Sequence, residues 1–371
     1  MEAKTVGVGI IGCGAISGIY LDNLTGRLPG ARIVACADLE MARAEAVAQK
    51  YAGVRALGVD ELLKDSAVSI VLNLTIPAAH YDVAMQAVKA GKHVYNEKPL
   101  TAELDDARKL MGAAADGALQ VGCAPDTVLG AGIQTCRKLI DDGAIGRPVA
   151  ATAFMMCHGH EGWHPNPFFY YQPGGGPLFD MGPYYLSALI TLLGPVSRVC
   201  GSVRKSFETR TITADPHKGE TIDVKVPTHT AAVLDFNAGA IGTLVTSFDV
   251  WSHNCPRIEI YGAEGSLSVP DPNTFGGPVR LRKPGGEWQD VELTHEYPEN
   301  SRGLGVADMA AAIAHNRTPR ASGAMAMHVL EIMHAVHIAA RDEVYVKPQG
   351  GGIQPEAVPA GKTVDQWDGG E

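Results

Sequence analysis

Two short segments, far apart in the sequence, carry the residues best suited to chemistry. Lys98 and Pro99 follow an apolar run, and three consecutive glycines at 174–176 lead to Asp180 and Tyr184. A lysine ammonium can hydrogen-bond a substrate oxygen and lower the pKa of a neighbouring hydroxyl. Asp180 and Tyr184 are four residues apart, so on a helix they lie on one face. The residues alone also allow a plainer interpretation, with Lys98 in a surface turn, Asp180 as a helix N-cap and Tyr184 packed in the core.

A histidine-rich segment lies between these two motifs. It contains His158, His160, Glu161 and His164. Three histidines and a glutamate suggest a metal site, but the sequence lacks the His-Glu-x-x-His pattern of a metal-binding helix. Histidines in loops can also bind sugar hydroxyls, or pack without a functional role. We therefore take His158 and His164 as candidate substrate contacts and expect no metal ion.

The first residues of the chain predict a nucleotide-binding turn. An apolar run ends at Gly12, and a turn through Gly14 leads into a predicted helix that starts near Ala15 and Ile16. Such a turn lets the backbone approach a pyrophosphate, and the N-terminus of the helix offers free N–H groups and a positive dipole end. These four residues are therefore candidate cofactor contacts.

Two registers of the glycine fingerprint compete in this segment. The spacing Gly7-x-Gly9-x-x-Gly12 fits literally but lies inside the predicted strand, where it cannot form the turn. The useful register is Gly12-x-Gly14-x-x-Ser17, with a serine in place of the third glycine.

A second apolar run ends in an acidic residue at the distance expected for a ribose contact. Asp38 lies 24 positions after Gly14, close to where a carboxylate binds the adenosine ribose. A carboxylate repels a 2′-phosphate, and Leu39 stands where an NADP site often has a basic residue. These residues favour NAD over NADP. The alternative is that Asp38 caps the helix predicted over residues 41–51.

The first third of the chain alternates strand and helix patterns. Strands that are apolar throughout, joined by helices, indicate a doubly wound parallel sheet buried on both faces, and we expect a domain over residues 1–124. The predicted strands are Val6–Ile11, Arg32–Ala37, Ser69–Leu74, His93–Asn96 and Leu119–Gly122, and the predicted helices 16–28, 41–51, 60–64, 80–90 and 103–116.

From residue 125 to 347 the pattern predicts an α+β domain with a large, open, mostly antiparallel sheet. One face of this sheet needs a cover, and burial against a second subunit predicts a homodimer or homotetramer. Residues 348–371 are expected to form an extended tail, either disordered or laid on a neighbour. The predicted strands are 149–156, 196–203, 228–236, 240–247, 257–261, 266–269 and 279–282, and the predicted helices 126–142, 180–193, 303–315 and 323–341.

The composition excludes several partners. The 371 residues carry a net charge of −10, which argues against nucleic acid or an anionic membrane as partner. No apolar run approaches the ~20 residues of a membrane helix. The seven cysteines form no C-x-x-C pair and are expected to be reduced. A short, acidic N-terminus does not match a signal peptide, so we expect a cytoplasmic location.

Taken together, these residues resemble the Gfo/Idh/MocA family of sugar and polyol oxidoreductases. The resemblance covers nearly the whole chain and implies a Rossmann domain, a second domain whose open sheet mediates dimers or tetramers, and hydride transfer between a nicotinamide cofactor and a carbohydrate carbon. It rests on Gly-Ile-Ile-Gly-Cys-Gly-Ala-Ile at 9–16, Glu97-Lys98-Pro99-Leu100, Gly174-Gly175-Gly176 with Asp180-Met-Gly182, and Ala326-Met-His328-Val-Leu330-Glu331.

The resemblance also assigns roles to the reactive residues. Lys98 and Asp180 match the family's lysine and aspartate, but the family usually has a histidine acid/base where this chain has Tyr184. Our hypothesis is that Tyr184, assisted by Lys98, takes the hydroxyl proton, while Asp180 orients Lys98 or the substrate. The alternatives are that Lys98 itself is the base, or that His158 or His164 supplies the missing group.

Further contacts follow from the same resemblance. Five residues are expected along the cofactor, two at the domain junction near substrate or nicotinamide, and one tryptophan stacked on a sugar ring. These are Thr75, Ile76, Pro77, His80 and Glu97; Asp126 and Thr127; and Trp163. An NAD-dependent sugar dehydrogenase is the first expectation. The alternatives are an NADP(H)-preferring keto-glycoside reductase, a redox-neutral sugar-converting enzyme, and a non-catalytic dinucleotide-binding regulator.

Overall fold

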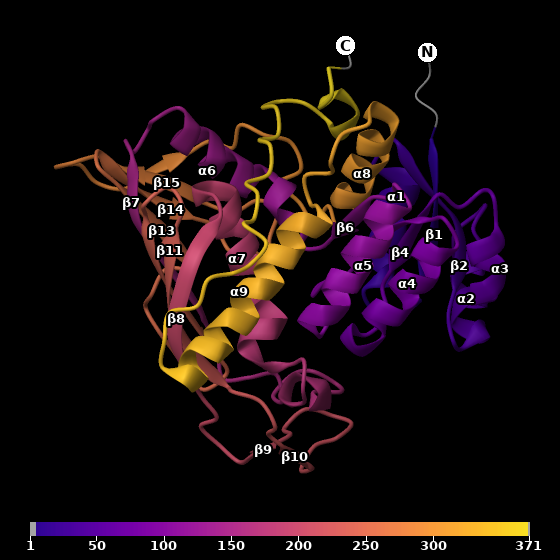
Figure 1. Ribbon diagram of the computed structural model, residues 1–371, viewed down its shortest axis with the longest axis horizontal. Coiled ribbons are helices and arrows are strands. Elements are labelled where there is room, and N and C mark those ends of the chain that lie inside the picture. Colours follow the sequence, from indigo (N-terminus) through magenta and orange to yellow (C-terminus); the bar gives the residue numbers. More distant parts are fainter. Residues whose placement is uncertain (1–4, 370–371) are drawn as a thin grey trace.

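The computed structural model describes residues 5–369, which form two large sheets with their covering helices and one small two-stranded sheet (Figure 1). The N-terminal sheet has six parallel strands in the order β3-β2-β1-β4-β5-β6, which is the doubly wound order of dinucleotide-binding domains. Its elements are β1 (Val6–Ile11), α1 (Ser17–Gly26), β2 (Ala31–Ala37), α2 (Met41–Lys50), β3 (Arg55–Ala56), α3 (Val59–Lys64), β4 (Ile70–Asn73), α4 (His80–Lys89), β5 (His93–Asn96), α5 (Leu104–Asp116) and β6 (Val121–Cys123).

Burial on both faces explains why these strands are apolar throughout. Ile70, Val71 and Leu72 of β4 are fully buried, and the strand pairs in parallel with β1 on one side and β5 on the other. The prediction of a doubly wound parallel sheet is confirmed. The sequence analysis missed β3, because a strand of two residues carries no periodic pattern.

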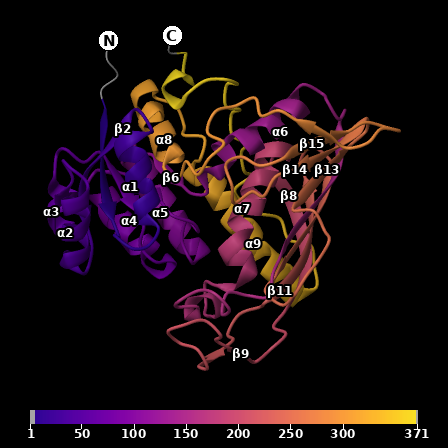
Figure 2. The same cartoon turned by 180° about the vertical axis from the view of Figure 1, so that it is seen from behind.

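The second sheet has eight strands in the order β16-β15-β14-β13-β7-β12-β11-β8. Figure 2 shows it from behind, with α7 and α9 on one face. Its elements are α6 (Ala131–Asp141), β7 (Pro148–Met156), α7 (Gly176–Leu193), β8 (Val196–Arg204), β11 (His229–Phe236), β12 (Ile241–Ser247), β13 (Ile258–Gly262), β14 (Gly265–Val269), β15 (Val279–Arg282), β16 (Gln289–Val291), α8 (Leu304–His315) and α9 (Gly323–Asp342), with a separate pair, β9 (Thr209–Thr211) and β10 (Thr221–Asp223).

The expected open, mostly antiparallel sheet is confirmed, with one parallel pair. Strand β7 enters the middle of the sheet, where it pairs in parallel with β12 and antiparallel with β13. Sequence reasoning assumed that consecutive strands are neighbours, so it missed this pair. It also missed the short strands β9, β10 and β16.

Two predicted helices begin elsewhere. Residues 126–129 form a 3₁₀ turn, and α6 starts at Ala131. Helix α7 starts at Gly176, so Asp180 lies inside the helix and is not its N-cap. The N-cap interpretation of Asp180 is therefore wrong, because the glycines that precede it are already part of the helix start.

The C-terminal segment is not a disordered tail. Val358, Val364 and Trp367 are buried in their own chain, and Arg317 forms an ion pair with Asp368. The segment up to residue 369 thus covers part of α8 instead of extending away from the molecule.

Helix α9 is the 20-residue apolar helix at the centre of the molecule (Figure 1). By length and composition it is the one helix in residues 5–369 that could span a membrane, which the sequence analysis did not anticipate. However, 67% of its most apolar window is buried inside the fold, where it packs on β8 and α7. Burial of this kind is that of a core helix.

Candidate active site

An ion pair between Lys98 and Asp180 joins the two parts of the chain. Lys98 follows β5 at the carboxyl end of the parallel sheet, and Asp180 projects from α7. The lysine Nζ donates to the Asp180 backbone carbonyl at 2.7 Å and to its Oδ1 at 2.9 Å. The carboxyl ends of such sheets are where ligands bind, so the pair lies where chemistry is expected.

The pair is charged at neutral pH. Burial alone would raise the pKa of Asp180, but the Lys98 ammonium and a bond from His160 hold it at about 2. Burial alone would lower the pKa of Lys98, but Asp180, Tyr184 and Glu97 outweigh that effect and raise it. Lys98 is therefore an ammonium and a hydrogen-bond donor, which disfavours the alternative that it acts as the base.

His160 is the histidine that the structure places on this pair. Its Nε2 lies 3.2 Å from Asp180 Oδ2, and its ring is buried against Tyr170 and Phe248. Sequence reasoning named His158 and His164 as the loop histidines that could supply a proton-transfer group. Among residues 5–369, the ion-pair partners of the Asp180 carboxylate are Lys98 and His160, and neither His158 nor His164 is one of them.

Tyr184 is buried one turn after Asp180, under the lysine. The Lys98 Nζ lies 5.2 Å from the centre of the phenol ring, and Arg302 interacts with the hydroxyl. Burial raises the pKa of Tyr184, and Lys98 and Arg302 offset this only in part. Desolvation is the larger effect, so Tyr184 is a neutral phenol in the protein without cofactor, although Lys98 favours the phenolate as expected.

Two cavities meet at these residues. One, of about 280 Å³, lies toward the parallel sheet, where Ile16, Thr75 and Pro77 line it. The other, of about 390 Å³, lies toward the second sheet, where Arg257 and Asn273 line it. Lys98, Tyr170, Asp180 and Tyr184 line both. These four residues thus form the wall between the two cavities. From the ligands that the sequence analysis expects, we call the first the cofactor-side cavity and the second the substrate-side cavity.

The glycine turn has the geometry that the useful register requires. Gly12 has a φ of 103°, and a Cβ there would lie 2.8 Å from the Leu74 carbonyl. At Gly14 a Cβ would meet nothing within 4 Å, so the turn is open on that side. Ser17, in the third glycine's place, begins α1 and donates its hydroxyl to the Gly14 carbonyl at 2.7 Å. The serine therefore stabilises the turn, which continues through Ala15 and Ile16 into α1.

The literal register serves packing. A Cβ at Gly7 would lie 1.9 Å from the Ala67 carbonyl oxygen, and one at Gly9 would lie 2.8 Å from the Leu62 side chain. These two glycines allow β1 to pack closely, and neither belongs to the turn.

Asp38 lies beside the glycine turn. Its Oδ2 accepts the Cys13 amide at 2.8 Å, and its Oδ1 accepts the Glu40 amide at 2.9 Å. The N-cap residue of α2 is Glu40, so Asp38 does not cap the helix in the usual position. The carboxylate is half-exposed at the carboxyl end of β2, where a ribose contact is expected.

The other predicted cofactor contacts divide into two groups. Thr75, Pro77 and Glu97 line the cofactor-side cavity, and Ile76 is exposed next to them. His80 is fully buried, with its ring nitrogens 2.7 Å from the Pro99 carbonyl and 3.1 Å from that of Thr75. We therefore revise His80 from a cofactor contact to a positioning residue that holds the Lys98 loop.

Asp126 and Thr127 are also buried, which removes them as direct substrate contacts. Asp126 Oδ2 accepts the amides of Gly303 and Gly305 at 2.8 and 3.0 Å, at the start of α8. Both residues lie just after β6, the last strand of the parallel sheet, and Asp126 satisfies backbone donors there.

Trp163 lines the substrate-side cavity and is largely exposed. His164 contacts Trp163 edge-on and accepts the Asn166 amide, while His158 stacks on Trp251. Sequence reasoning missed Arg302, Arg257 and Asn273, which line the same cavity from loops without a recognisable motif. Among residues 5–369 there is no group of three His, Cys, Asp or Glu side chains placed to hold a metal ion.

Two family models match the chain. Residues 6–123 match the oxidoreductase family with an NAD-binding Rossmann fold, and residues 133–268 match the GFO/IDH/MocA C-terminal domain. The chain belongs to the Gfo/Idh/MocA oxidoreductase family. Its N-terminal region is the NAD-binding Rossmann fold of that family, which confirms the predicted family and the class of cofactor.

Curated relatives in this family act on inositols. The chain is 32% identical over 173 residues to an inositol 2-dehydrogenase of Rubrobacter xylanophilus, covering 44% of this chain and 45% of that protein. It is 26% identical over 268 residues to the NAD(+)-dependent scyllo-inositol 2-dehydrogenase of Bacillus subtilis, covering 70% and 72%. The match thus spans about half the length of the first of these relatives.

Solved structures share the fold over 93% of the chain. An NAD binding oxidoreductase from Klebsiella pneumoniae matches with a TM-score of 0.80 and 22% identity, covering 99% of that chain. A levoglucosan dehydrogenase in complex with NADH and L-sorbose matches with a TM-score of 0.78 and 20% identity, also covering 99% of its chain. At these identities the likeness establishes the two-part fold.

The burial of Tyr184 predicts the outcome of a pH titration. The difference in tyrosinate absorbance between the wild type and Tyr184→Phe should show no ionisation step at or below pH 10, because burial raises the pKa of Tyr184 above its ordinary value of 10.0. Circular dichroism at each pH confirms that both proteins remain folded. A step near neutral pH in the difference curve would contradict this and restore the phenolate.

Proposed function

We propose that this chain is an NAD-dependent oxidoreductase that moves a hydride between the nicotinamide and a carbon of a sugar or cyclic polyol. The observation that carries the proposal is the wall of Lys98, Asp180 and Tyr184 between the two cavities. A hydride can pass only between carbons in near contact. Because the same residues line both cavities, a nicotinamide in one and a substrate in the other would meet beside Lys98, Asp180 and Tyr184, where proton-handling groups are present.

The residues present fit a dinucleotide. The open backbone at Gly14 and the N-terminus of α1 suit a pyrophosphate, and Asp38 suits the adenosine ribose. Thr75 and Pro77 line the cavity that leads from this turn to Lys98. When bound, the nicotinamide accepts or gives the hydride.

Lys98 supplies charge stabilisation at the substrate oxygen. A lysine ammonium has three N–H donors, and Asp180 takes two of them through its carbonyl and its Oδ1. The third N–H remains for a substrate. Aimed at the oxygen of the reacting carbon, it favours the form in which that oxygen carries negative charge. Asp180 keeps the lysine charged and fixes its direction.

Tyr184 carries the proton. It is a neutral phenol in the free protein, so in the reducing direction it donates its proton to the oxygen as the hydride reaches the carbon. The phenolate that results lies next to Lys98 and Arg302, which stabilise it until a proton returns from solvent. In the oxidising direction the same steps run backward: the phenol of Tyr184 first gives its proton to solvent, the phenolate then takes the hydroxyl proton as the hydride leaves the carbon, and a C=O bond forms.

The substrate-side cavity suits a molecule with several hydroxyl groups. Arg257, Asp271 and Asn273 provide charged and amide groups on one side, and Trp163 and Tyr185 provide aromatic faces on another. A sugar or cyclitol has both hydroxyls and an apolar C–H face. The inositol dehydrogenases among the relatives support this substrate class.

The first test is turnover with a panel of sugars and inositols in the presence of NAD. We expect reduced-nicotinamide absorbance to appear, and Lys98→Ala and Tyr184→Phe each to lower kcat by roughly 10²–10⁴-fold, since both act on the charged oxygen of the transition state. Lys109→Ala, at an exposed lysine of α5, is the control and should keep full activity.

Other outcomes of this experiment separate the remaining candidates. Lys98→Ala leaves a buried carboxylate without its partner, so the double variant Lys98→Ala with Asp180→Asn checks that loss of folding is not the cause. Tight NAD binding without turnover of any substrate would favour a regulator. Turnover seen only when an oxidised and a reduced sugar are supplied together would favour a redox-neutral enzyme.

The position of Asp38 predicts a preference for NAD over NADP. Asp38→Ser should weaken NAD binding and shrink the ratio of NADP to NAD dissociation constants by about tenfold or more, because charge-assisted hydrogen bonds to the ribose and repulsion of a 2′-phosphate are both lost. Titration calorimetry measures both constants. Glu40→Ser, two residues away and exposed, is the matched control. Equal affinity of the wild type for both cofactors would contradict the preference.

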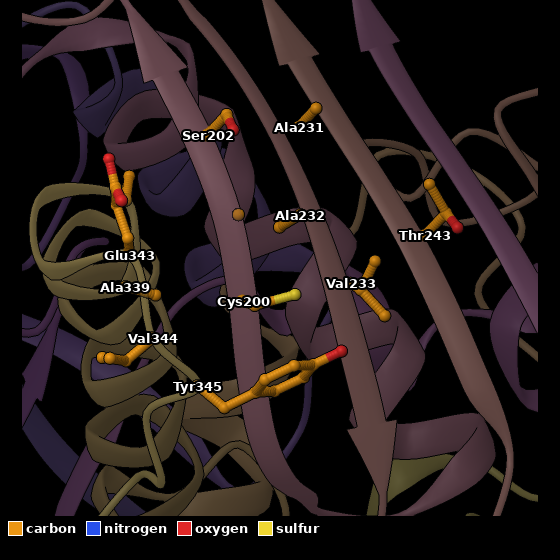
Figure 3. A pocket seen from close by; sticks show the side chains of 12 residues that line it. Cys200, Ser202, Ala231, Ala232, Val233, Thr243, Ala339, Glu343, Val344 and Tyr345 are labelled. Carbon is orange, nitrogen blue, oxygen red and sulfur yellow. The ribbon is translucent and has the colours of Figure 1, made fainter.

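We also propose self-association through the face of the second sheet that the helices leave open. Figure 3 shows Cys200, Val233, Thr243 and Tyr345 standing on this face, over β8, β11 and β12. Small side chains make the face flat, and Ile241 at its rim is more than half exposed. A flat, partly apolar sheet face suits an identical face on a second copy.

Light scattering tests this proposal. The wild type should have a molar mass of two or four times the 39.1 kDa of one chain. Val233→Lys should lower this mass toward that of the monomer, because the variant would bury a charge at the contact. Ala115→Lys, on the exposed face of α5, should leave the mass unchanged. A monomeric wild type would overturn the proposal.

Since α9 is a core helix, we propose a cytoplasmic location for the assembly.

A further inference from the structure

A third cavity, of about 690 Å³, opens next to the substrate-side cavity. The two share Gly159 and Trp163, so one continues into the other around the tryptophan. Strand β9 and the segment after β12 form its other walls, through Thr209 and Trp251. In Figure 1 the β9–β10 ribbon lies beyond the end of the large sheet, apart from the sheet itself. We call this third space the outer cavity.

Large aromatic side chains line the outer cavity and face solvent. Trp251 is 82% exposed, Trp163 63% and Phe207 48%. One face of Trp251 stacks on His158, with ring centres 3.3 Å apart, and its exposure shows that the other face is open. Exposed aromatic groups gathered around one space mark a binding surface more than a folding requirement.

The exposed polar side chains that line the outer cavity from β9 and the residues after it are threonines. Thr209 and Thr211 are exposed on β9 and line the cavity, with Thr213 just after them. A hydroxyl both donates and accepts a hydrogen bond, so these threonines suit a partner that is itself rich in hydroxyls. Aromatic faces beside hydroxyls match a sugar ring, which has an apolar C–H face and a polar edge.

At the floor of the outer cavity a buried arginine is paired with two carboxylates, so no free positive charge faces the space. Arg210, between the two exposed threonines, is buried, with Glu161 at 2.9 Å and Asp249 at 3.5 Å. Its Nη2 donates to the His158 carbonyl at 3.1 Å, and the Tyr171 hydroxyl donates to Glu161. Burial and the nearby Arg210 lower the pKa of His158, so its ring is neutral near pH 7. An uncharged ring system therefore suits this space better than a phosphate or an acidic peptide.

We propose that the outer cavity binds the second ring of a glycoside or disaccharide whose reacting ring lies in the substrate-side cavity. Trp163 stands between the two rings and Trp251 stacks on the outer one. The inference rests on the proposed function, and it narrows the substrate class from free sugars to glycosides. Two consecutive residues also connect the outer cavity with the candidate site: Glu161 pairs with Arg210 under the outer cavity, and His160 contacts Asp180.

Calorimetric titration tests the outer cavity without turnover. In the presence of NAD, cellobiose, maltose and lactose are titrated against glucose and galactose. At least one disaccharide should bind about tenfold more tightly than its component monosaccharides, since a second ring places further apolar surface against Trp251. If every disaccharide binds no better than its monosaccharides, the proposal is overturned.

A variant pair locates the gain. Trp251→Ala should reduce the ratio of disaccharide to monosaccharide affinity by about tenfold, because the stacking face is lost. Trp288→Ala is the matched control, since Trp288 lies near Arg280 on the β15–β16 turn and lines neither cavity. Phe207→Ala, a second wall of the outer cavity, should act in the same direction as Trp251→Ala. Thermal unfolding shows that each variant is folded.

The same proteins distinguish failure of this inference from failure of the proposed function. If sugars are oxidised or reduced but Trp251→Ala leaves the disaccharide-to-monosaccharide ratio of kcat/KM unchanged, the outer cavity is not a sugar subsite and the proposed function stands. If no sugar is turned over but disaccharide binding still depends on Trp251, the subsite stands and the proposed reaction fails.

Discussion

The buried ion pair between Lys98 and Asp180 is the interaction on which the rest of the structure depends. It ties the loop after β5 to the first turns of α7, so it fixes how the parallel sheet faces the second sheet. Two charges out of water are costly unless each has its partners, and here Lys98 has the backbone carbonyl as well as the carboxylate, while His160 contacts the other carboxylate oxygen. The same ion pair therefore holds the two domains together and positions the Lys98 ammonium at the candidate site.

Around this pair the neighbouring residues act by position. His80 occupies no cofactor surface, but its two ring nitrogens meet the carbonyls of Thr75 and Pro99 and so fix the loop that carries Lys98. Asp126 fixes the start of α8 by accepting the Gly303 amide. The preceding residue, Arg302, interacts with the Tyr184 hydroxyl. Side chains that the sequence suggested as ligand contacts thus serve as supports one step behind the site.

Local patterns predicted the fold, and they pointed to Lys98, Asp180 and Tyr184, which the structure brings together; the rest depends on long-range geometry. The glycine turn, Asp38 and the lysine motif are recognisable because backbone chemistry restricts which residues can stand there. The choice among three neighbouring histidines was beyond the sequence, since it depends on which ring the loop turns toward α7. The net effect on the Tyr184 phenol was also beyond the sequence, which shows the charge of Lys98 but not the burial that outweighs it. Arg302, Arg257 and Asn273 come from loops whose path only tertiary structure determines.

The parallel pairing of β7 with β12 has a consequence for how the second sheet forms. Strand β7 is the first of that sheet to be synthesised, yet both of its neighbours come from about 90 residues or more further along the chain, since Ala150 pairs with Ile241 and with Tyr261. Until β12 and β13 are synthesised, both edges of the apolar strand β7 remain unpaired. Non-local pairing of this kind slows folding, and this unpaired strand is the point at which the newly made chain is most exposed to aggregation.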